Sequence, residues 1–234
     1  LKDAALFEVG PTYQNPTPSG QRFVATGVRY GKTVARGWAA PERAADAFDA
    51  KADALAALAA IGAPVENLQT KPTAPAWYHP GRSGTLILGD RPYAIFGEIH
   101  PEILAALDLR GSAAAFEVFI DAPPPPKARG SKARTMLKLA ALQPLERDFA
   151  FIVDNAVAAE TLTRAARGAD RQMIVAAQVF DVYAGQGVPD GKKSVALSVT
   201  IQPTDKTLTD AEIEAISQKV VAQVAKQAGG TLRG

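Results

Sequence analysis

Four side chains in the second half of the chain could together recognise a nucleic acid. Tyr183 lies in the segment Phe180–Gly185, and Lys192, Lys193 and Ser194 follow after a loop that contains Gly and Pro. An aromatic ring offers a stacking surface to an unpaired base, lysines contact phosphates, and a serine hydroxyl bonds to a base edge. In the competing interpretation, Tyr183 and Phe180 are core or rim aromatic residues and the lysines are ordinary turn charges. The residues alone leave both interpretations open.

No catalytic or metal-binding residues are predicted. Neither common Gly-rich phosphate loop occurs, and His-Glu-x-x-His and Gly-x-Ser-x-Gly are also absent from the sequence. The lack of cysteine excludes disulfides, thiolate zinc sites and cysteine nucleophiles. His79 and His100 each precede a proline, which favours a loop or a strand end over a metal site. Glu98 and Glu102 form a candidate carboxylate pair, but Glu102 is better explained as a first-turn charge that favours the helix dipole.

The second half of the chain predicts a sheet that would position the four side chains. Strands are expected at 148–153, 173–183, 193–201 and 231–232, and helices at 158–167 and 209–227. The resulting order, β-α-β-β-α-β, is the ferredoxin-like split motif. Residues 194–201 alternate small, mostly polar side chains with large apolar ones, so one face should pack under helices while the other stays small and polar.

The first half predicts a mixed α+β domain with an antiparallel sheet. Strands are expected at 5–9, 22–30, 33–36, 85–88, 92–99 and 114–120. The second and third of these should form a hairpin around the turn at Gly31-Lys32. A helix is expected at 46–61, where Phe48, Leu55, Leu58 and Ile61 fall mostly at helical spacings in an alanine-rich run, and a short helix should follow Pro101.

A polyproline segment divides the two halves. The 234 residues favour two domains, and Pro123–Pro126 can continue neither a helix nor a central strand. We expect a first domain at 1–126, a basic linker at 127–142 and a second domain at 143–234. Residues 1–126 carry 11 basic and 13 acidic side chains, whereas 127–234 carry 15 and 11. The cations from Lys127 to Arg147 belong either to a solvated linker or to a contact with phosphates.

The composition predicts a soluble, cytoplasmic protein that does not enter a membrane. No apolar run approaches the roughly 18–20 residues that span a bilayer. The first residue is Leu1 rather than methionine, so we expect the chain to be cut from a longer one.

Several motifs occur in an order that resembles one known family. Those in the second half are Leu145–Phe151, Phe180–Gly185, Gly191–Leu197, Lys206–Asp210 and Leu232-Arg233. Those in the first half are Leu6–Gly10, Phe48–Lys51, Tyr78–Ser83 and Gly97–Pro101. Together they resemble the C-terminal part of the bacterial phenylalanyl-tRNA synthetase β subunit, over nearly the whole chain. Ala52 departs from the pattern, because the family usually has glycine after the lysine.

The resemblance implies an inactive class II synthetase-like domain followed by a ferredoxin-fold anticodon-binding domain. The chain agrees, since it has no Gly-x-Gly-x-Gly-x-x-Arg segment to hold ATP. The resemblance further implies a heterotetramer of two α and two β subunits that attaches phenylalanine to tRNA(Phe) with ATP and magnesium, the chemistry being performed by α. This chain would supply tRNA binding and a subunit interface, with no cofactor, metal or catalytic residue of its own. The family's editing domain and its magnesium cluster would lie upstream.

Six residues are predicted to bind RNA on these grounds. Tyr183 and Ser194 occupy the positions that the resemblance implies contact the first anticodon base. The remaining four come from the basic segments and matching motifs and are Lys192, Lys193, Arg147 and Asp181.

Two other functions remain open. A generic RNA-binding module would be expected to carry paired aromatic residues on its central strands, and residues 194–200 have none. A purely structural protein would use the first half as an interface and the second as a ferredoxin-like spacer. Salt-dependent tRNA binding separates these possibilities, because a spacer should show none.

Overall fold

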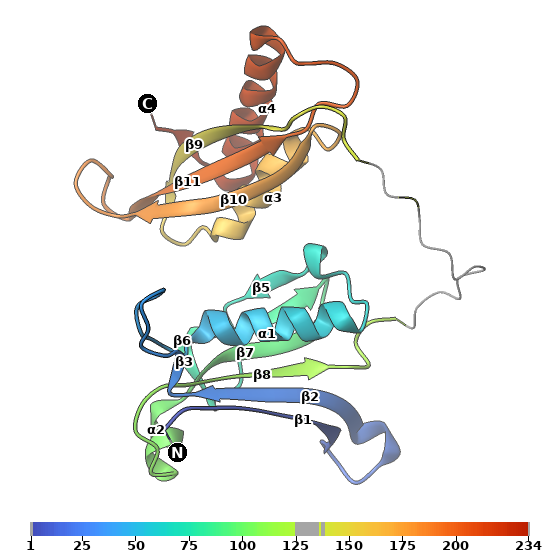
Figure 1. The fold of residues 1–234 in the computed structure, drawn as a ribbon, viewed down its shortest axis with the longest axis vertical. Coiled ribbons are helices and arrows are strands. Elements are labelled where there is room, and N and C mark those ends of the chain that lie inside the picture. Colours follow the sequence, from blue (N-terminus) through green and yellow to red (C-terminus); the bar gives the residue numbers. More distant parts are fainter. Residues whose placement is uncertain (1, 125–135, 137–138, 234) are drawn as a thin grey trace. The chain divides into compact units, whose positions relative to one another are not determined.

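The chain folds into two compact units, Leu1–Ser131 and Lys132–Gly234 (Figure 1). The computed structural model describes residues 2–124, 136 and 139–233. Most of the predicted basic linker, and the second half of the polyproline segment, lie outside the described residues. The predicted boundaries at 126 and 142 therefore stay predictions, and each unit is described by itself.

The first unit is built on a six-stranded antiparallel sheet with the order β1-β2-β8-β7-β6-β5 (Figure 1). Its strands are β1 (Ala4–Tyr13), β2 (Gln21–Tyr30), β5 (Gln69–Lys71), β6 (Tyr78–Leu88), β7 (Arg91–Ile99) and β8 (Ala113–Phe119). A separate two-stranded ladder joins β3 (Lys32–Val34) to β4 (Arg43–Ala44). The helices are α1 (Ala47–Ala60) and α2 (Pro101–Ala106), with single 3-10 turns at Pro18–Gly20 and Val65–Asn67.

The predicted hairpin around Gly31-Lys32 is wrong. Both edges of β2 are already occupied, because Tyr30 lies opposite Ala4 of β1 on one side and Ala113 of β8 on the other. No edge is left for the following strand. Gly31 turns the chain away with a φ of 79°, and β3 pairs with β4 instead.

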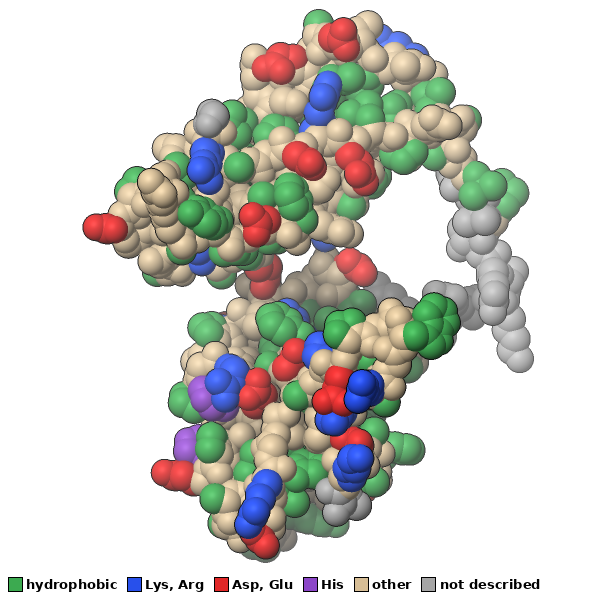
Figure 2. Space-filling model, turned by 60° about the vertical axis from the view of Figure 1, so that its left-hand side comes forward, with side chains coloured by type: hydrophobic (Ala, Val, Ile, Leu, Met, Phe, Trp, Pro, Cys, Tyr) green, Lys and Arg blue, Asp and Glu red, His purple; other side chains and the backbone are tan. Residues whose placement is uncertain are grey.

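Helix α1 forms where the sequence predicts it, and alanines make up much of its buried face. Ala50, Ala54 and Leu58 are buried, whereas Phe48 is 79% exposed. The Asp46 carboxylate caps the helix by accepting from the backbone N–H groups of residues 48 and 49, and Arg43 binds Asp49 at 2.6 Å. Small alanine side chains let the helix lie close to β7 and β8. Figure 2 shows acidic and basic side chains side by side on this unit.

The second unit has the predicted β-α-β-β-α-β order, which confirms the fold class. Its strands are β9 (Leu145–Asp154), β10 (Ile174–Tyr183), β11 (Lys192–Ile201) and β12 (Thr231–Leu232), and its helices are α3 (Ala159–Ala169) and α4 (Asp210–Ala228). The antiparallel sheet has the order β10-β11-β9-β12, and both helices cover the same face (Figure 1).

The core of the second unit follows the alternation of β11. Val195, Leu197 and Val199 are fully buried beneath the helices together with Phe151 of β9. The short strand β12 covers only part of the outer edge of β9, where the N–H of Arg233 donates to the carbonyl of Ala150 at 2.8 Å. No helix within the described ranges is long and apolar enough to cross a membrane.

Candidate nucleic-acid interface

One face of the four-stranded sheet is not covered by a helix, and four predicted RNA-binding residues belong to it. Tyr183 of β10 lies directly opposite Ser194 of β11, and Asp181 lies opposite Ala196. Side chains alternate between the faces of a strand, so these residues lie on the opposite face from buried Val195 and Leu197. Lys192 shares this side of β11. We call this surface the open face.

Tyr183 lies at the rim of the open face rather than in the core. Its side chain is 41% exposed, and its hydroxyl donates to the carbonyl of Gln186 at 3.3 Å. A Cβ on Gly185 would lie 2.7 Å from the Tyr183 hydroxyl, so only glycine allows the loop to pass this close to the ring. Phe180, at a register irregularity of the same strand, is also exposed, at 59%. Neither ring is a core residue.

Ser194 is more covered than the polar pattern of its strand suggests. It is only 5% exposed, with Tyr183 beside it on one strand and Ile152 on the other. The described residues provide no hydrogen-bond partner for its hydroxyl, and the hydroxyl oxygen is not fully buried. The hydroxyl therefore keeps its capacity to bind a polar ligand group, but only one that reaches in past its neighbours.

Arg233 belongs to the same surface and was missed by the sequence analysis. Its backbone is fixed beside Ala150, and its guanidinium carbon lies 6.0 Å from the centre of the Tyr183 ring. That geometry is a cation–π contact, and it adds a positive charge beside the ring. The motif Leu232-Arg233 was visible in the sequence. Its proximity to Tyr183 depends on the order of the strands, which residue spacing does not reveal.

The two lysines are held by contacts at the corner where β11 begins. Lys192 Nζ lies 3.4 Å from Asp154 Oδ1, and Lys193 Nζ donates to the carbonyl of Asn155 at 3.0 Å. Lys193 lies on the same side of β11 as Val195, so its side chain is not on the open face with that of Lys192. The pair places positive charge near Tyr183, but part of it is neutralised by Asp154.

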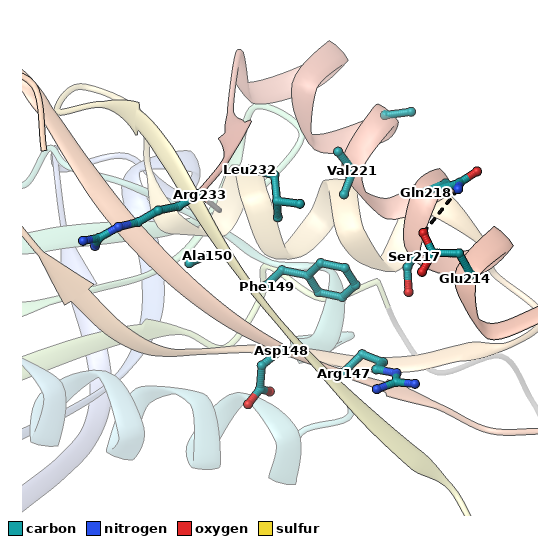
Figure 3. Close-up of a pocket in the computed structure, with 11 residues that line it drawn as sticks. Arg147, Asp148, Phe149, Ala150, Glu214, Ser217, Gln218, Val221, Leu232 and Arg233 are labelled. Atoms are coloured by element: carbon teal, nitrogen blue, oxygen red, sulfur yellow. Dashed lines mark hydrogen bonds between the residues drawn. The ribbon is translucent and has the colours of Figure 1, made fainter. Parts of the chain in front are cut away.

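Arg147 is not brought together with the other predicted residues. Figure 3 shows it on the helix side of β9, beside a hollow of about 650 Å³ between β9, β12 and α4. Phe149 and Val221 line this hollow together with Ser217. Asp148 points to the other side of the strand (Figure 3).

The first unit uses its candidate chemical residues for structure. His79 Nδ1 accepts from the N–H of Gly81 at 3.1 Å, and His100 Nδ1 accepts from the N–H of Glu102 at 3.3 Å, where α2 begins. The Glu98 carboxylate binds Arg82 at 2.6 Å. Among the residues that the structure describes, no three His, Asp or Glu side chains gather into a metal site.

A buried polar cluster in the first unit also has a structural explanation. The Glu117 carboxylate accepts from Trp77 Nε1 at 2.9 Å and from the Tyr78 hydroxyl at 3.1 Å. Burial raises the pKa of Tyr78 well above its usual range, and the charge of Glu117 raises it further. The phenol therefore stays protonated and acts as a fixed hydrogen-bond donor.

Strand β1 exposes an unusual amount of apolar surface. It pairs with β2 on one side, and in the described residues no strand pairs with its other edge. Its exposed large side chains are Leu6 (62%), Phe7 (84%), Val9 (56%) and Tyr13 (69%). Phe7, Val9 and Tyr13 lie on one face of the strand and Leu6 on the other. Exposed large apolar side chains gathered on one face are typical of interaction surfaces.

Comparison with known families assigns both units. Residues 1–120 match the phenylalanyl tRNA synthetase beta chain CLM domain, and residues 140–233 match the ferredoxin-fold anticodon binding domain. The phenylalanine–tRNA ligase beta subunit of Paramagnetospirillum magneticum is 56% identical over the whole chain. The beta subunits of Rhodospirillum rubrum and Mesorhizobium japonicum are 52% and 51% identical over 99% and 100% of the chain.

The chain spans only 29–30% of the length of these relatives. The domain matches nevertheless cover both structural units, and the anticodon-binding match includes the whole open face with Tyr183, Ser194 and Arg233. The chain therefore belongs to the phenylalanyl-tRNA synthetase β-chain family and carries that family's ferredoxin-fold anticodon-binding domain as its second unit.

Proposed function

We propose that the second unit binds the anticodon region of tRNA(Phe) on its open face. The observation that carries this proposal is the cluster at one corner of the sheet. An exposed Tyr183 ring lies beside the Arg233 guanidinium and next to a Ser194 hydroxyl without a protein partner in the described chain. A ring and a planar cation can stack on an unpaired base, and the hydroxyl can bond to its edge.

The predicted residues have distinct roles in this proposal. Tyr183 and Ser194 contact the first anticodon base, and the exposed Asp181 carboxylate accepts from donors of the bound nucleotides. Lys192 and Lys193 bind phosphates, after Lys192 exchanges its contact with Asp154 for the RNA. Arg147 contributes at most through its charge, because it lies on the other side of the sheet.

We further propose that the first unit is a subunit interface and that chemistry takes place elsewhere. The apolar side chains of β1 support the interface, since burying them against a protein would remove them from water. The complete enzyme would be a cytoplasmic heterotetramer of two α and two β subunits, with ATP and magnesium used by α. The 234-residue chain alone should give no phenylalanine-dependent pyrophosphate exchange, and measurable exchange would contradict the proposal.

The anticodon proposal is tested in the assembled enzyme with alanine variants. Loss of a stacked ring costs about 1–3 kcal/mol per base, whereas loss of a neutral hydrogen bond costs about 0.5–1.5 kcal/mol. Tyr183→Ala should therefore lower charging of cognate tRNA more than Ser194→Ala, while phenylalanine activation stays intact. Phe180→Ala is the matched control, because it removes an exposed ring from the same strand.

The readout is charging efficiency on tRNA with the native and with a substituted first anticodon base. The Tyr183→Ala defect should be large with the native base and small with the substituted one. Equal defects on both tRNAs, or none in a folded variant, would show that the ring does not read this base.

A further inference from the structure

Helix α3 presents basic side chains on the face opposite to the core. Arg164 and Arg167 lie three residues apart and are both exposed, while Leu162, Ala165 and Ala166 are fully buried. With 3.6 residues per turn, the two arginines share one side of the helix and the buried residues share the other. Arg171, also exposed, follows in the turn after the helix. We call these three residues the arginine face.

The charges of the arginine face are not neutralised within the described protein. No ion pair or side-chain hydrogen bond joins any of the three guanidinium groups to another described residue. Asp170 is the nearest acid along the chain, but its carboxylate binds Lys219 Nζ at 2.9 Å. The hydrogen bond from Lys219 lowers the pKa of Asp170, with smaller contributions from backbone N–H groups. Glu160 lies at the start of the helix, one turn before Arg164.

Helix stability explains only one of the three arginines. Arg167 is in the last turn of α3, where a cation interacts favourably with the helix dipole. Arg164 lies in the middle of the helix and Arg171 lies beyond its end, so neither gains as much from that position. The concentration of guanidinium groups therefore requires another explanation.

The surface suits phosphate better than protein. Arginine presents parallel N–H groups that match the oxygens of a phosphate. A protein interface would need an aromatic or aliphatic anchor at its centre, and none of the large exposed apolar side chains of the described chain belongs to α3. A charged surface without an apolar centre is typical of contacts to a nucleic-acid backbone.

We propose that Arg164, Arg167 and Arg171 form a second RNA-binding surface that contacts the phosphate backbone of tRNA. This inference rests on the proposed tRNA binding and adds a separate contact to it. The helices cover one face of the sheet (Figure 1), and the pairing of Tyr183 with Ser194 places Tyr183 on the other, so the arginine face meets a different segment of RNA from the anticodon bases. A contact to phosphates does not distinguish one base from another, so it should strengthen the binding of tRNAs of different sequence equally.

The test replaces the three arginines with glutamine in the full β subunit assembled with α. The dissociation constant of full-length tRNA is measured over a series of salt concentrations. Each lost phosphate contact lowers the slope of log affinity against log salt by about 0.7–0.9, so the triple variant should lose about 2–3 units of slope. Lys226→Gln is the matched control, since Lys226 is an exposed cation on α4 that no ion pair of the described residues involves.

A second variant separates charge from side-chain shape. Lysine at all three positions keeps the positive charge, so most of the salt slope should remain. An unchanged slope and affinity in the folded glutamine variant would overturn the inference. Weaker assembly with α at an unchanged tRNA slope would also overturn it, in favour of a protein contact. If Tyr183→Ala impairs charging while the glutamine variant does not alter the slope, the anticodon proposal stands and only this inference fails.

Discussion

The two units use large apolar side chains in opposite ways. In the second unit, Val195 and Leu197 of β11 are buried beneath the helices, and the open face carries mostly small or polar side chains. In the first unit, alanines such as Ala54 fill part of the contact between α1 and the sheet, while Phe7 and Val9 of β1 stay exposed. Both sheets are antiparallel and each has helices packed on it. The difference lies in where apolar surface remains uncovered.

This difference suits the two units to different partners. A sheet that has buried its large apolar residues can present a polar corner with an exposed aromatic ring to an RNA. A sheet that leaves such residues on an edge strand gains free energy when another protein covers them. The proposed functions follow this difference, with the RNA at the second unit and the protein contact at the first.

The largest expected effect tests whether the units have independent cores. Phe151→Ala should destabilise the second unit by about 3–5 kcal/mol, and Leu58→Ala should destabilise the first by about 2–5 kcal/mol, because both side chains are fully buried. Both tryptophans, Trp38 and Trp77, belong to the first unit. In urea unfolding, Phe151→Ala should shift the circular dichroism transition but not the tryptophan fluorescence transition. A shift of both would contradict independent unfolding.

A smaller effect is expected at the two helix starts. Asp46→Ala and Thr209→Ala each remove an N-cap, which typically costs about 0.5–2 kcal/mol. Asp46 accepts from two backbone N–H groups and also binds Arg43, whereas Thr209 accepts only from Glu212. The free energy of unfolding should therefore fall more for Asp46→Ala. Asp46→Asn keeps the cap without the charge, and a loss equal to that of alanine would assign the effect to the ion pair.

Acid should weaken the first unit through Asp49. The hydrogen bond from Arg43 lowers the pKa of Asp49 from its ordinary value of 3.8 to about 2. A carboxylate with a lowered folded pKa stabilises the protein above its unfolded pKa, and this contribution is lost as the pH falls through about 2. Asp49→Asn should flatten the dependence of unfolding free energy on pH between these values. The same slope in both proteins would show that Asp49 does not contribute.

A similar carboxylate in the second unit serves as the comparison. Lys206 lowers the pKa of Glu212 to about 2 as well, but this group lies at the surface, where solvent screens the interaction. Glu212→Gln should therefore flatten the acid dependence less than Asp49→Asn does. If Glu212→Gln flattened the acid dependence as much as Asp49→Asn or more, the difference in burial between the two carboxylates would not explain their contributions to stability.

The smallest effect is expected on β1. Phe7→Ser should change the free energy of unfolding by no more than about 0.5 kcal/mol, because the side chain is 84% exposed in the folded chain. Co-purification of the full β subunit with α should nevertheless weaken. A large loss of stability without any loss of assembly would reverse the assignment of this surface.

The second unit was more predictable from the sequence than the first. The alternation of β11 identified Val195, Leu197 and Val199 as core, because a strand buried on one face imposes a period of two. The buried face of α1 could not be identified from its large apolar residues, because Phe48 is exposed and alanines carry too weak a hydrophobic signal to mark a packing face. The hairpin at Gly31 failed because strand pairing across the sheet depends on distant partners such as β8.

The candidate site could be predicted only in part. The motif around Tyr183 and the residues before Ser194 indicated one corner of the sheet, and the register of β10 and β11 brings these two together. Arg233 could not be predicted there, because it arrives through β12 on the far side of β9. The positive charge of Arg147 suggested that it belongs to the site. Side chains alternate between the two faces of β9, however, and that of Arg147 lies on the helix side.

The shortness of β12 has a consequence for how the second unit behaves among copies of itself. Since the carbonyl of Ala150 faces β12, the main-chain groups of Asp148 and Glu146 face the same edge beyond the end of that strand. An open strand edge invites a foreign strand and hence aggregation. Three consecutive charged residues, Glu146 to Asp148, occupy this stretch, and charge on an edge strand opposes such addition. Among the described residues no strand pairs with this stretch, and its charges oppose pairing with another copy of the unit.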